Sequence, residues 1–451
     1  MGKIKLFFWL LLFFLGFKKA QAQTIIKKIE YSNTEQINVR VIEREMPFVL
    51  GDTLHDLQRT LYSFENRIVS LGLFTQVDLR MINDSTLRIK ALEKVYVWGL
   101  PKFSLADPNF SQWLQTKDIK RIALGADLFA KNLRGLKNQI TISGLIGFNS
   151  YATILYEKVP QGREWNHGFF VKAGVGFRSQ QKMGIENDKL VWKNGTKPYL
   201  RYRKVGAGLN WRKGLFSTAG IQINTECIKI APNGYLNTLF TQADSAINYY
   251  GFTAHYTLDK RVQQHFPIAG FFFNSKIHLK KIIGNRTSWT VPEINIKANK
   301  YISMHENWIL IAGLVGTYQL SETPFYYSTG LGLDRDYIRG YEPYTFIGKG
   351  YMLGRISLAY GLKNNKKVKI TEKKWSKNYG TMPFSLWCSI FAENGKIVEP
   401  VLVGNTLANK NLYSIGLSLH ALAYYNSSLR MDVALNRLSQ VVGNVSFRNA
   451  F

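Results

Sequence analysis

From Trp98 to the C-terminus, this chain consists of short segments in which polar and apolar residues alternate, separated by Gly, Asn or charged turns. The clearest segment, 413–423, carries its apolar side chains on one face: Tyr413, Ile415, Leu417, Leu419, Ala421 and Ala423. The opposite face is polar or small: Ser414, Gly416, Ser418 and His420. Alternating segments of about ten residues are typical of strands that cross a membrane in a barrel. A soluble sheet with one buried face shows the same alternation, so other features must decide between the two.

The N-terminus is typical of an export signal. Lys3 and Lys5 precede an apolar core, 6–17, that is too short to span a bilayer, and Ala20-Gln21-Ala22 supplies small residues at the cleavage spacing. We therefore expect a signal peptide over 1–22. Beyond it, no apolar run reaches the ~18 residues of a transmembrane helix. The export signal, together with an aromatic C-terminus, favours a transmembrane barrel over a soluble β protein.

The formal net charge of +29 is large and comes from 59 Lys and Arg against 30 Asp and Glu. A polar lumen and loops near lipid phosphates account for it, whereas a nucleic-acid partner would require a recognisable binding fold, which the sequence lacks. The His residues are scattered without an HExxH or paired metal spacing, and no GxSxG elbow is present. We therefore expect no enzyme activity, no metal, no cofactor and no nucleic acid.

Residues 23–95 have the pattern of a small α/β module. Alternation predicts a strand at 25–31, apolar residues at three-to-four spacing predict a helix over 53–71, and two strands follow at 74–81 and 86–92. Three sequence features in this order resemble a POTRA domain, the periplasmic module of outer-membrane assembly proteins. They are the Arg44-Glu45-Met46 and Gly51-Asp52 turn, Leu71-Gly72-Leu73-Phe74 followed by Val77, and the closing strand 87–93.

A loop motif stands out in the C-terminal part of the chain. It consists of Ile338, Arg339, Gly340 and Tyr341. It follows a stretch rich in Gly and charge, 330–337, and precedes a strand-like run, 350–360. An Arg beside a Gly on a long loop suits a plug in a polar cavity. In the later segment 383–395, alternation places five residues toward the lumen: Ser385, Trp387, Ser389, Phe391 and Glu393.

The export signal, the single POTRA-like module and the barrel with its Ile-Arg-Gly-Tyr loop together resemble the BamA superfamily of outer-membrane assembly factors (bacterial surface antigens). The resemblance implies a mainly β fold, with a transmembrane antiparallel β-barrel over 96–451 behind one small α/β POTRA domain. At roughly 22 residues per strand and loop, this length accommodates about 16 strands. In this family the Arg-Gly-Phe/Tyr motif tips a loop that folds back into the barrel and contacts acidic residues on its inner wall.

The same resemblance names a partner for Arg339. Phe391-x-Glu393-x-Gly395 is similar to the family's Phe-x-Asp-x-Gly wall motif, with Glu for Asp, and the alternation independently turns Glu393 toward the lumen. An Arg–carboxylate pair can be bidentate and would fix the loop. We call the contact between the Ile-Arg-Gly-Tyr loop and the inner wall the latch. The family pattern has a second acid where this chain has Ala359, so we predict a latch in which Arg339 pairs with one acid only. Two nearby acids remain alternatives: Glu342 and Asp336.

Two further segments carry predictions. The last strand places Val445, Phe447 and Phe451 on one face, which resembles the terminal signal for barrel insertion, although Asn449 departs from it. Residues 363–377 hold seven Lys and one Glu in a predicted periplasmic turn. This segment is either a solvated extension or a docking site for lipid phosphates or an acidic partner, which salt would weaken. The candidate docking residues are Lys366, Lys367, Lys369, Lys373 and Lys374.

The resemblance implies a function without cofactor: assisting the insertion of other outer-membrane proteins, or the passage of polypeptide. The expected partners are unfolded outer-membrane protein clients, periplasmic or lipoprotein accessory subunits, and outer-membrane lipid. The expected location is the bacterial outer membrane, with the POTRA domain and the C-terminus in the periplasm. Two alternatives remain open, a dedicated secretion pore for one partner protein and a passive porin-like channel.

Overall fold

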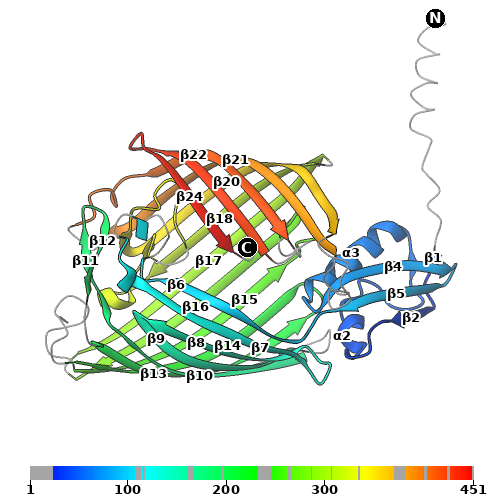
Figure 1. Cartoon of the computed structure of the whole chain (residues 1–451), viewed down its shortest axis with the longest axis horizontal. Helices are drawn as coiled ribbons and strands as arrows, with labels where there is room; N and C mark the ends of the chain where they lie inside the picture. The colour runs from blue at the N-terminus through cyan, green and yellow to red at the C-terminus, as the bar shows by residue number, and fades with distance from the viewer. Residues whose placement is uncertain are drawn as a thin grey trace, which may run out of the picture.

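The computed structural model describes residues 24–107, 113–114, 117–160, 166–194, 198–231, 245–262, 266–285, 287–305, 307–333, 336–369, 381–400, 404–423 and 427–448. The chain is mainly β, as expected: a small α/β module lies at one end of a large curled sheet, and the hairpin of β11 (Gln180–Glu186) and β12 (Lys189–Asn194) lies at the other (Figure 1). The predicted signal peptide, 1–22, lies outside the described residues. No helix in the described part of the chain is both long enough and apolar enough to cross a membrane.

The N-terminal module folds around one three-stranded sheet. Its elements are β1 (Thr24–Ile25), β2 (Lys28–Ser32), α2 (Arg40–Glu43), β3 (Thr53–Leu54), α3 (Leu57–Ser70), β4 (Phe74–Asn83) and β5 (Thr86–Glu93). β5 is central, parallel to β2 and antiparallel to β4. The helix begins later than the spacing predicts, because Asp56 caps it by accepting a hydrogen bond from the backbone N–H of Arg59 at 2.9 Å. Phe64 of α3 and Ile89 of β5 are fully buried in one core.

The large sheet contains seventeen strands in the described chain, and sixteen of them follow one another around it. They are β6 (Val97–Leu105), β7 (Ile122–Leu133), β8 (Asn138–Gly147), β9 (Asn149–Lys158), β10 (Asn166–Arg178), β13 (Leu200–Lys213), β14 (Ser217–Ile230), β15 (Ala246–Asp259), β16 (Gly270–Gly284), β17 (Ser288–His305), β18 (Trp308–Gln319), β20 (Phe346–Lys369), β21 (Thr381–Pro400), β22 (Leu412–Ala423), β23 (Ser427–Asn436) and β24 (Val441–Arg448). The three-residue β19 (Thr329–Leu331) shares an edge of β20 with β18. The expectation of about sixteen strands agrees with this sheet.

The two ends of this sheet, β6 and β24, come together to complete the ring order. Along the described residues they do not share an extended ladder, whereas their other neighbours pair continuously: β6 with β7 from Val97 to Leu105, and β24 with β23 from Val441 to Arg448. The sheet is therefore a barrel with one weakly joined seam, between its first and last strands.

Alternation assigned the faces of β21, β22 and β24 correctly at the residues whose exposure decides between the two walls. On β22, Tyr413, Ile415, Leu417 and Leu419 are exposed on the outside, while Ser414 and Ser418 are buried on the inside. On β21, Trp387, Phe391 and Glu393 are buried inside and Ile390 is exposed. Large apolar side chains thus cover the outer wall and polar ones line the lumen, which is the reverse of a soluble barrel.

The lysine-rich segment differs from its prediction as a turn. β20 continues to Lys369, paired with Thr381 of β21, although β18 pairs with β20 only as far as Tyr360. Residues 363–369 therefore extend a β-hairpin beyond the neighbouring strand, because the β20–β21 ladder resumes after two register shifts. Residues 370–380, with Lys373 and Lys374, lie outside the described residues, and only the backbone is described for Lys366, Lys367 and Lys369.

Candidate functional site

The loop between β18 and β20 lies inside the barrel. It contains a 3₁₀ turn, η2 (Phe325–Tyr327), then β19, and it returns to the wall at Phe346. Ile338 and Tyr341 are each 1% exposed and pack with Leu353 of β20 and Leu412 of β22 in one buried cluster. A long loop inside a polar lumen is stable only if its apolar side chains pack against the wall and its buried backbone groups find hydrogen-bond partners.

Arg339 and Glu393 meet at the centre of this loop–wall contact. The Nε of Arg339 donates to Oε1 of Glu393 at 2.6 Å, and the backbone N–H of Arg339 donates to Oε2 at 2.8 Å. Both carboxylate oxygens are thus engaged by one residue, and both side chains are buried. The guanidinium carbon lies 3.4 Å from the centroid of the Phe391 ring, so the wall motif supplies a carboxylate and an aromatic face together.

A second acid takes part, and the sequence analysis missed it. Asp432 on β23 lies 3.9 Å from Nη1 of Arg339, and Ser418 bridges them by accepting from Nη1 at 2.9 Å and donating to Asp432 at 2.5 Å. The prediction of a single-acid latch is therefore wrong. Asp432 of β23 thus supplies the second acid that Ala359 does not. The register of β22 and β23 places Ser418 directly opposite Asp432. In the sequence of 429–436, Leu429, Met431, Val433 and Leu435 form one apolar face. This alternation turns Asp432 inward, but no motif marks it as a partner.

The two acids named as alternatives have other roles. Asp336 accepts a hydrogen bond from the hydroxyl of Tyr351 at 2.7 Å, and Glu342 accepts one from the backbone N–H of Gly340 at 2.8 Å. Glu342 therefore stabilises the loop's own conformation, and Asp336 holds the loop against β20. Arg355 of β20 also approaches Glu393, with 3.2 Å between Nε and Oε1, so this carboxylate faces two guanidinium groups.

Two glycines make room for the latch. Gly340 has a positive φ of 88°, and its carbonyl accepts from Nδ2 of Asn436 at 2.8 Å. At Gly395, a Cβ atom would lie 2.4 Å from Cδ1 of Ile338, so the glycine of the wall motif leaves the space that the loop's isoleucine fills. The structure therefore brings together all seven residues of the predicted loop and wall motifs.

Comparison with known proteins is informative at the level of structure only. No protein-family model and no curated protein matches the chain. Among solved structures, BamA from Haemophilus ducreyi lacking POTRA domains 1–3 is similar with a TM-score of 0.52 and 12% identity, covering 94% of this chain and 85% of that one. CdiB from Escherichia coli is similar with a TM-score of 0.53 and 10% identity, covering 94% and 75%. This chain has the BamA-type barrel fold.

The other predicted residues of this BamA-type barrel lie apart from the latch. Val445 on β24 is 52% exposed on the outer wall, as its alternation predicts, and Asn444 is buried on the inner one. Only the backbone of Phe447 is described, and Phe451 lies outside the described residues. The terminal insertion signal therefore remains a prediction, as does the docking role of the lysine-rich hairpin.

A second buried ion cluster joins the α/β module to the BamA-type barrel. Glu45, which follows α2, accepts two hydrogen bonds from Arg212 of β13, Nη1 to Oε1 at 2.7 Å and Nη2 to Oε2 at 2.8 Å. Arg67 of α3 lies 3.0 Å from the same carboxylate and Arg44 lies 3.1 Å from it. Burial by itself would raise the pKa of Glu45, but the hydrogen bonds and charge of Arg212, with Arg67 and Arg44, lower it to about 2.

Backbone contacts support the same junction. Nη1 of Arg44 donates to the carbonyl of Pro160 at 2.7 Å, and Nη2 of Arg67 donates to the carbonyl of Leu215 at 2.7 Å. These carbonyls belong to turns between barrel strands, so the module docks on one rim of the barrel. In the described part of the chain, no group of three or more His, Cys, Asp or Glu side chains is arranged to hold a metal ion.

Proposed function

We propose that this protein resides in the bacterial outer membrane and assists the insertion of other barrel proteins, with its module as a POTRA domain on the periplasmic side. The observation that supports this most is the seam between β6 and β24. An unpaired strand edge exposes backbone N–H and C=O groups, each of which costs several kcal/mol in hydrocarbon. A passive channel gains nothing from such an edge, and pore-forming barrels close completely to remove it. A client strand gains a template from it.

The proposed mechanism has three parts, each performed by a separate region. The module presents β2 and β4 as the edges of its sheet, on which an extended client segment can pair by β-augmentation. The rim junction at Glu45 holds that sheet next to the barrel. At the seam, β6 parts from its weakly joined neighbour β24 and offers that edge to the first client strand. The latch at Arg339 keeps the loop against β20–β23, so that the wall beside the seam stays ordered while the seam opens.

Site-specific photo-crosslinking tests the proposal. A photoreactive residue replaces Val97 of β6, which is 72% exposed, and Val171 in the middle of the outer wall, 47% exposed, is the control. During synthesis of an outer-membrane client, we expect client adducts at Val97 and none at Val171, together with loss of many barrel proteins from the membrane when the protein is depleted. Equal adducts at both sites, or no change in membrane content, would refute the assembly role.

A dedicated secretion pore is the second candidate. The observation that favours it is a polar lumenal cavity of about 900 Å³ that shares Arg355 with the latch and is also lined by Lys276, Lys297 and Arg430. A photoreactive residue at Thr253, which lines the same cavity, would then capture a single exported protein, and depletion would remove that protein alone from the medium.

A further inference from the structure

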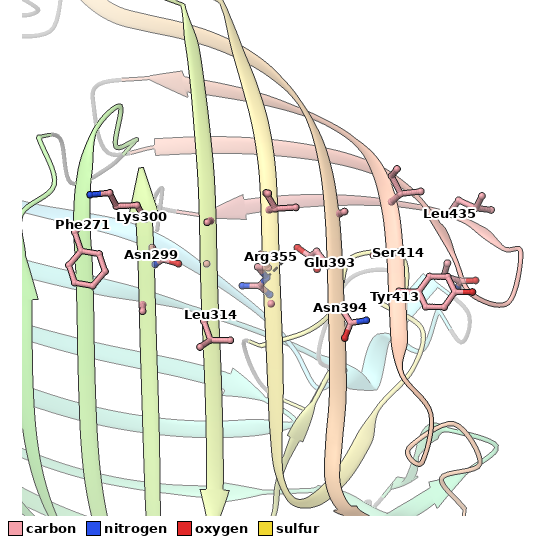
Figure 2. A pocket seen from close by; sticks show the side chains of 18 residues that line it. Phe271, Asn299, Lys300, Leu314, Arg355, Glu393, Asn394, Tyr413, Ser414 and Leu435 are labelled. Atoms are coloured by element: carbon pink, nitrogen blue, oxygen red, sulfur yellow. Dashed lines mark ion pairs between the residues drawn. The ribbon is translucent and has the colours of Figure 1, made fainter. Parts of the chain in front are cut away.

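The outer wall carries a groove that crosses several strands. It has a volume of about 830 Å³ and runs from Phe271 of β16, through β17, β18, β20, β21 and β22, to Leu435 of β23 (Figure 2). Phe271 is the second residue of β16, at the module end of the barrel, and Leu435 is the last residue but one of β23, at the other end. The groove therefore crosses the apolar wall obliquely from one rim toward the other.

Small residues form the floor of this groove. Ala298, Ala312, Gly354 and Ala392 lie on four successive strands, and the register places each of them opposite a large outward side chain. Ala298 is opposite Leu314, which is opposite Gly354 in turn, while Ala312 and Ala392 flank Ile356 on either side. Because the small positions alternate between two neighbouring rows, the spaces left by their missing side chains join into one continuous depression. Its apolar floor and its course across seven strands suit a hydrocarbon chain.

One charge interrupts the apolar wall at the module end of the groove. Lys300 pairs with Phe271 on one side and Ala312 on the other, and its side chain is exposed to the outside. Two more outward apolar residues of the same strand, Ile302 at 43% and Met304 at 63% exposure, separate it from the rim. A lysine on the lipid face of a barrel is destabilising, most at mid-membrane and less near the interface. In the described chain no carboxylate forms an ion pair with Lys300, so an external anion is the group that would offset this cost.

We propose that this groove is a binding site for one phospholipid of the leaflet at the module end, with an acyl chain over Ala312, Gly354 and Ala392 and the phosphate on Lys300. The apolar floor alone would accept any hydrocarbon, but an ammonium at one end of it selects an amphiphile with an anionic head, because a lysine binds phosphate as a point charge. The latch residues Arg355 and Glu393 also line this groove, but the proposed lipid contacts are outward side chains of the neighbouring positions. The inference rests on the proposed membrane location and not on the proposed assembly role. Bound there, the lipid would cover the wall three to six strands from β24 at the seam.

A photoactivatable phospholipid tests this. The full-length protein is reconstituted in phosphatidylcholine vesicles with a trace of phosphatidylglycerol that carries a diazirine on one acyl chain, and adducts are mapped by mass spectrometry. We expect adducts to concentrate on β18 and β20. Lys300→Gln should lower them about tenfold, and Ala312→Leu, which fills the floor, should do the same without changing any charge. Lys396→Gln is the matched control, because Lys396 is an exposed lysine on β21 that does not line the groove.

Heat-dependent migration in gels verifies that every variant is folded before it is scored. A diazirine-labelled diacylglycerol, which lacks the phosphate, should label the groove equally in the parent protein and in Lys300→Gln. Adducts spread evenly around the barrel would overturn the site. Equal labelling of Lys300→Gln and Lys396→Gln by the phospholipid would overturn the assignment of the phosphate.

Discussion

The barrel carries a buried arginine–glutamate cluster near each end, and the two are built differently. Around Glu393, two acids and the guanidinium groups of Arg339 and Arg355 share one network on the inner wall, and most of its members come from adjacent strands. Around Glu45, one acid faces three arginines, of which only Arg212 belongs to the barrel. The first cluster holds a loop inside a wall that is already ordered. The second joins two bodies that have separate cores, so we expect its loss to loosen their contact without unfolding either.

Charge reversal at the latch should have the largest effect of any single change. Removing one partner of a buried ion pair costs roughly 3–5 kcal/mol, and Arg339→Glu also places two carboxylates in contact. We expect the loop to leave the wall, which protease cleavage within 332–345 measures, and client insertion to fall with it. The compensating double variant Arg339→Glu with Glu393→Arg should recover part of both.

The recovery would be partial for a reason visible in the structure. In the swapped pair, the new glutamate faces Asp432 at the distance where Arg339 now lies, and the new arginine faces Arg355. If the single and double variants were cleaved at the same rate, direct pairing would not be what holds the loop.

Opening the junction at Glu45 should have an intermediate effect. Glu45→Gln keeps the shape but removes the carboxylate that three arginines share, at a cost of about 1.5–3 kcal/mol, typical of hydrogen bonds to charged groups. Faster hydrogen exchange should appear at 40–46 and 213–217, with the barrel strands unchanged. Glu30→Gln is the control, since its ion pairs with Lys28 and Arg88 are largely exposed and should contribute little.

The same junction should respond to acid in a defined direction. The pKa of Glu45 is depressed from 4.5 to about 2 in the folded protein. A depressed carboxylate pKa adds stability that is complete above the unfolded value and is lost as the pH falls through the folded one. Docking of the module should therefore hold at pH 5 and weaken between about pH 4.5 and pH 2. Release already complete at pH 5 would show that Glu45 does not control the junction.

The sequence predicted the latch more fully than the junction, for physical reasons. A β-strand has a period of two, so one apolar face on 383–395 was enough to turn Glu393 inward. Gly395 was named only through the resemblance to the family's wall motif. Asp432 was assigned to the inner face by the same rule, but its pairing with Arg339 depends on a bridge through Ser418 and on strand register across β21–β23, which alternation does not specify. Glu45 and Arg212 are 167 residues apart. No local pattern relates them, because their contact is set by how the module docks on the barrel.

Gly395→Ala should give the smallest effect and separates packing from charge at the latch. The added methyl group would meet Cδ1 of Ile338 at 2.4 Å, and because this is the end of a flexible side chain, it can move at the usual cost of overpacking, about 1–3 kcal/mol. We expect faster cleavage of the loop than in the parent protein and slower cleavage than in Arg339→Glu. Gly184→Ala in the β11–β12 hairpin is the matched control, because a Cβ there meets nothing within 4 Å. Cleavage as fast as in Arg339→Glu would mean that the fit of Ile338, and not the ion pair, dominates the latch.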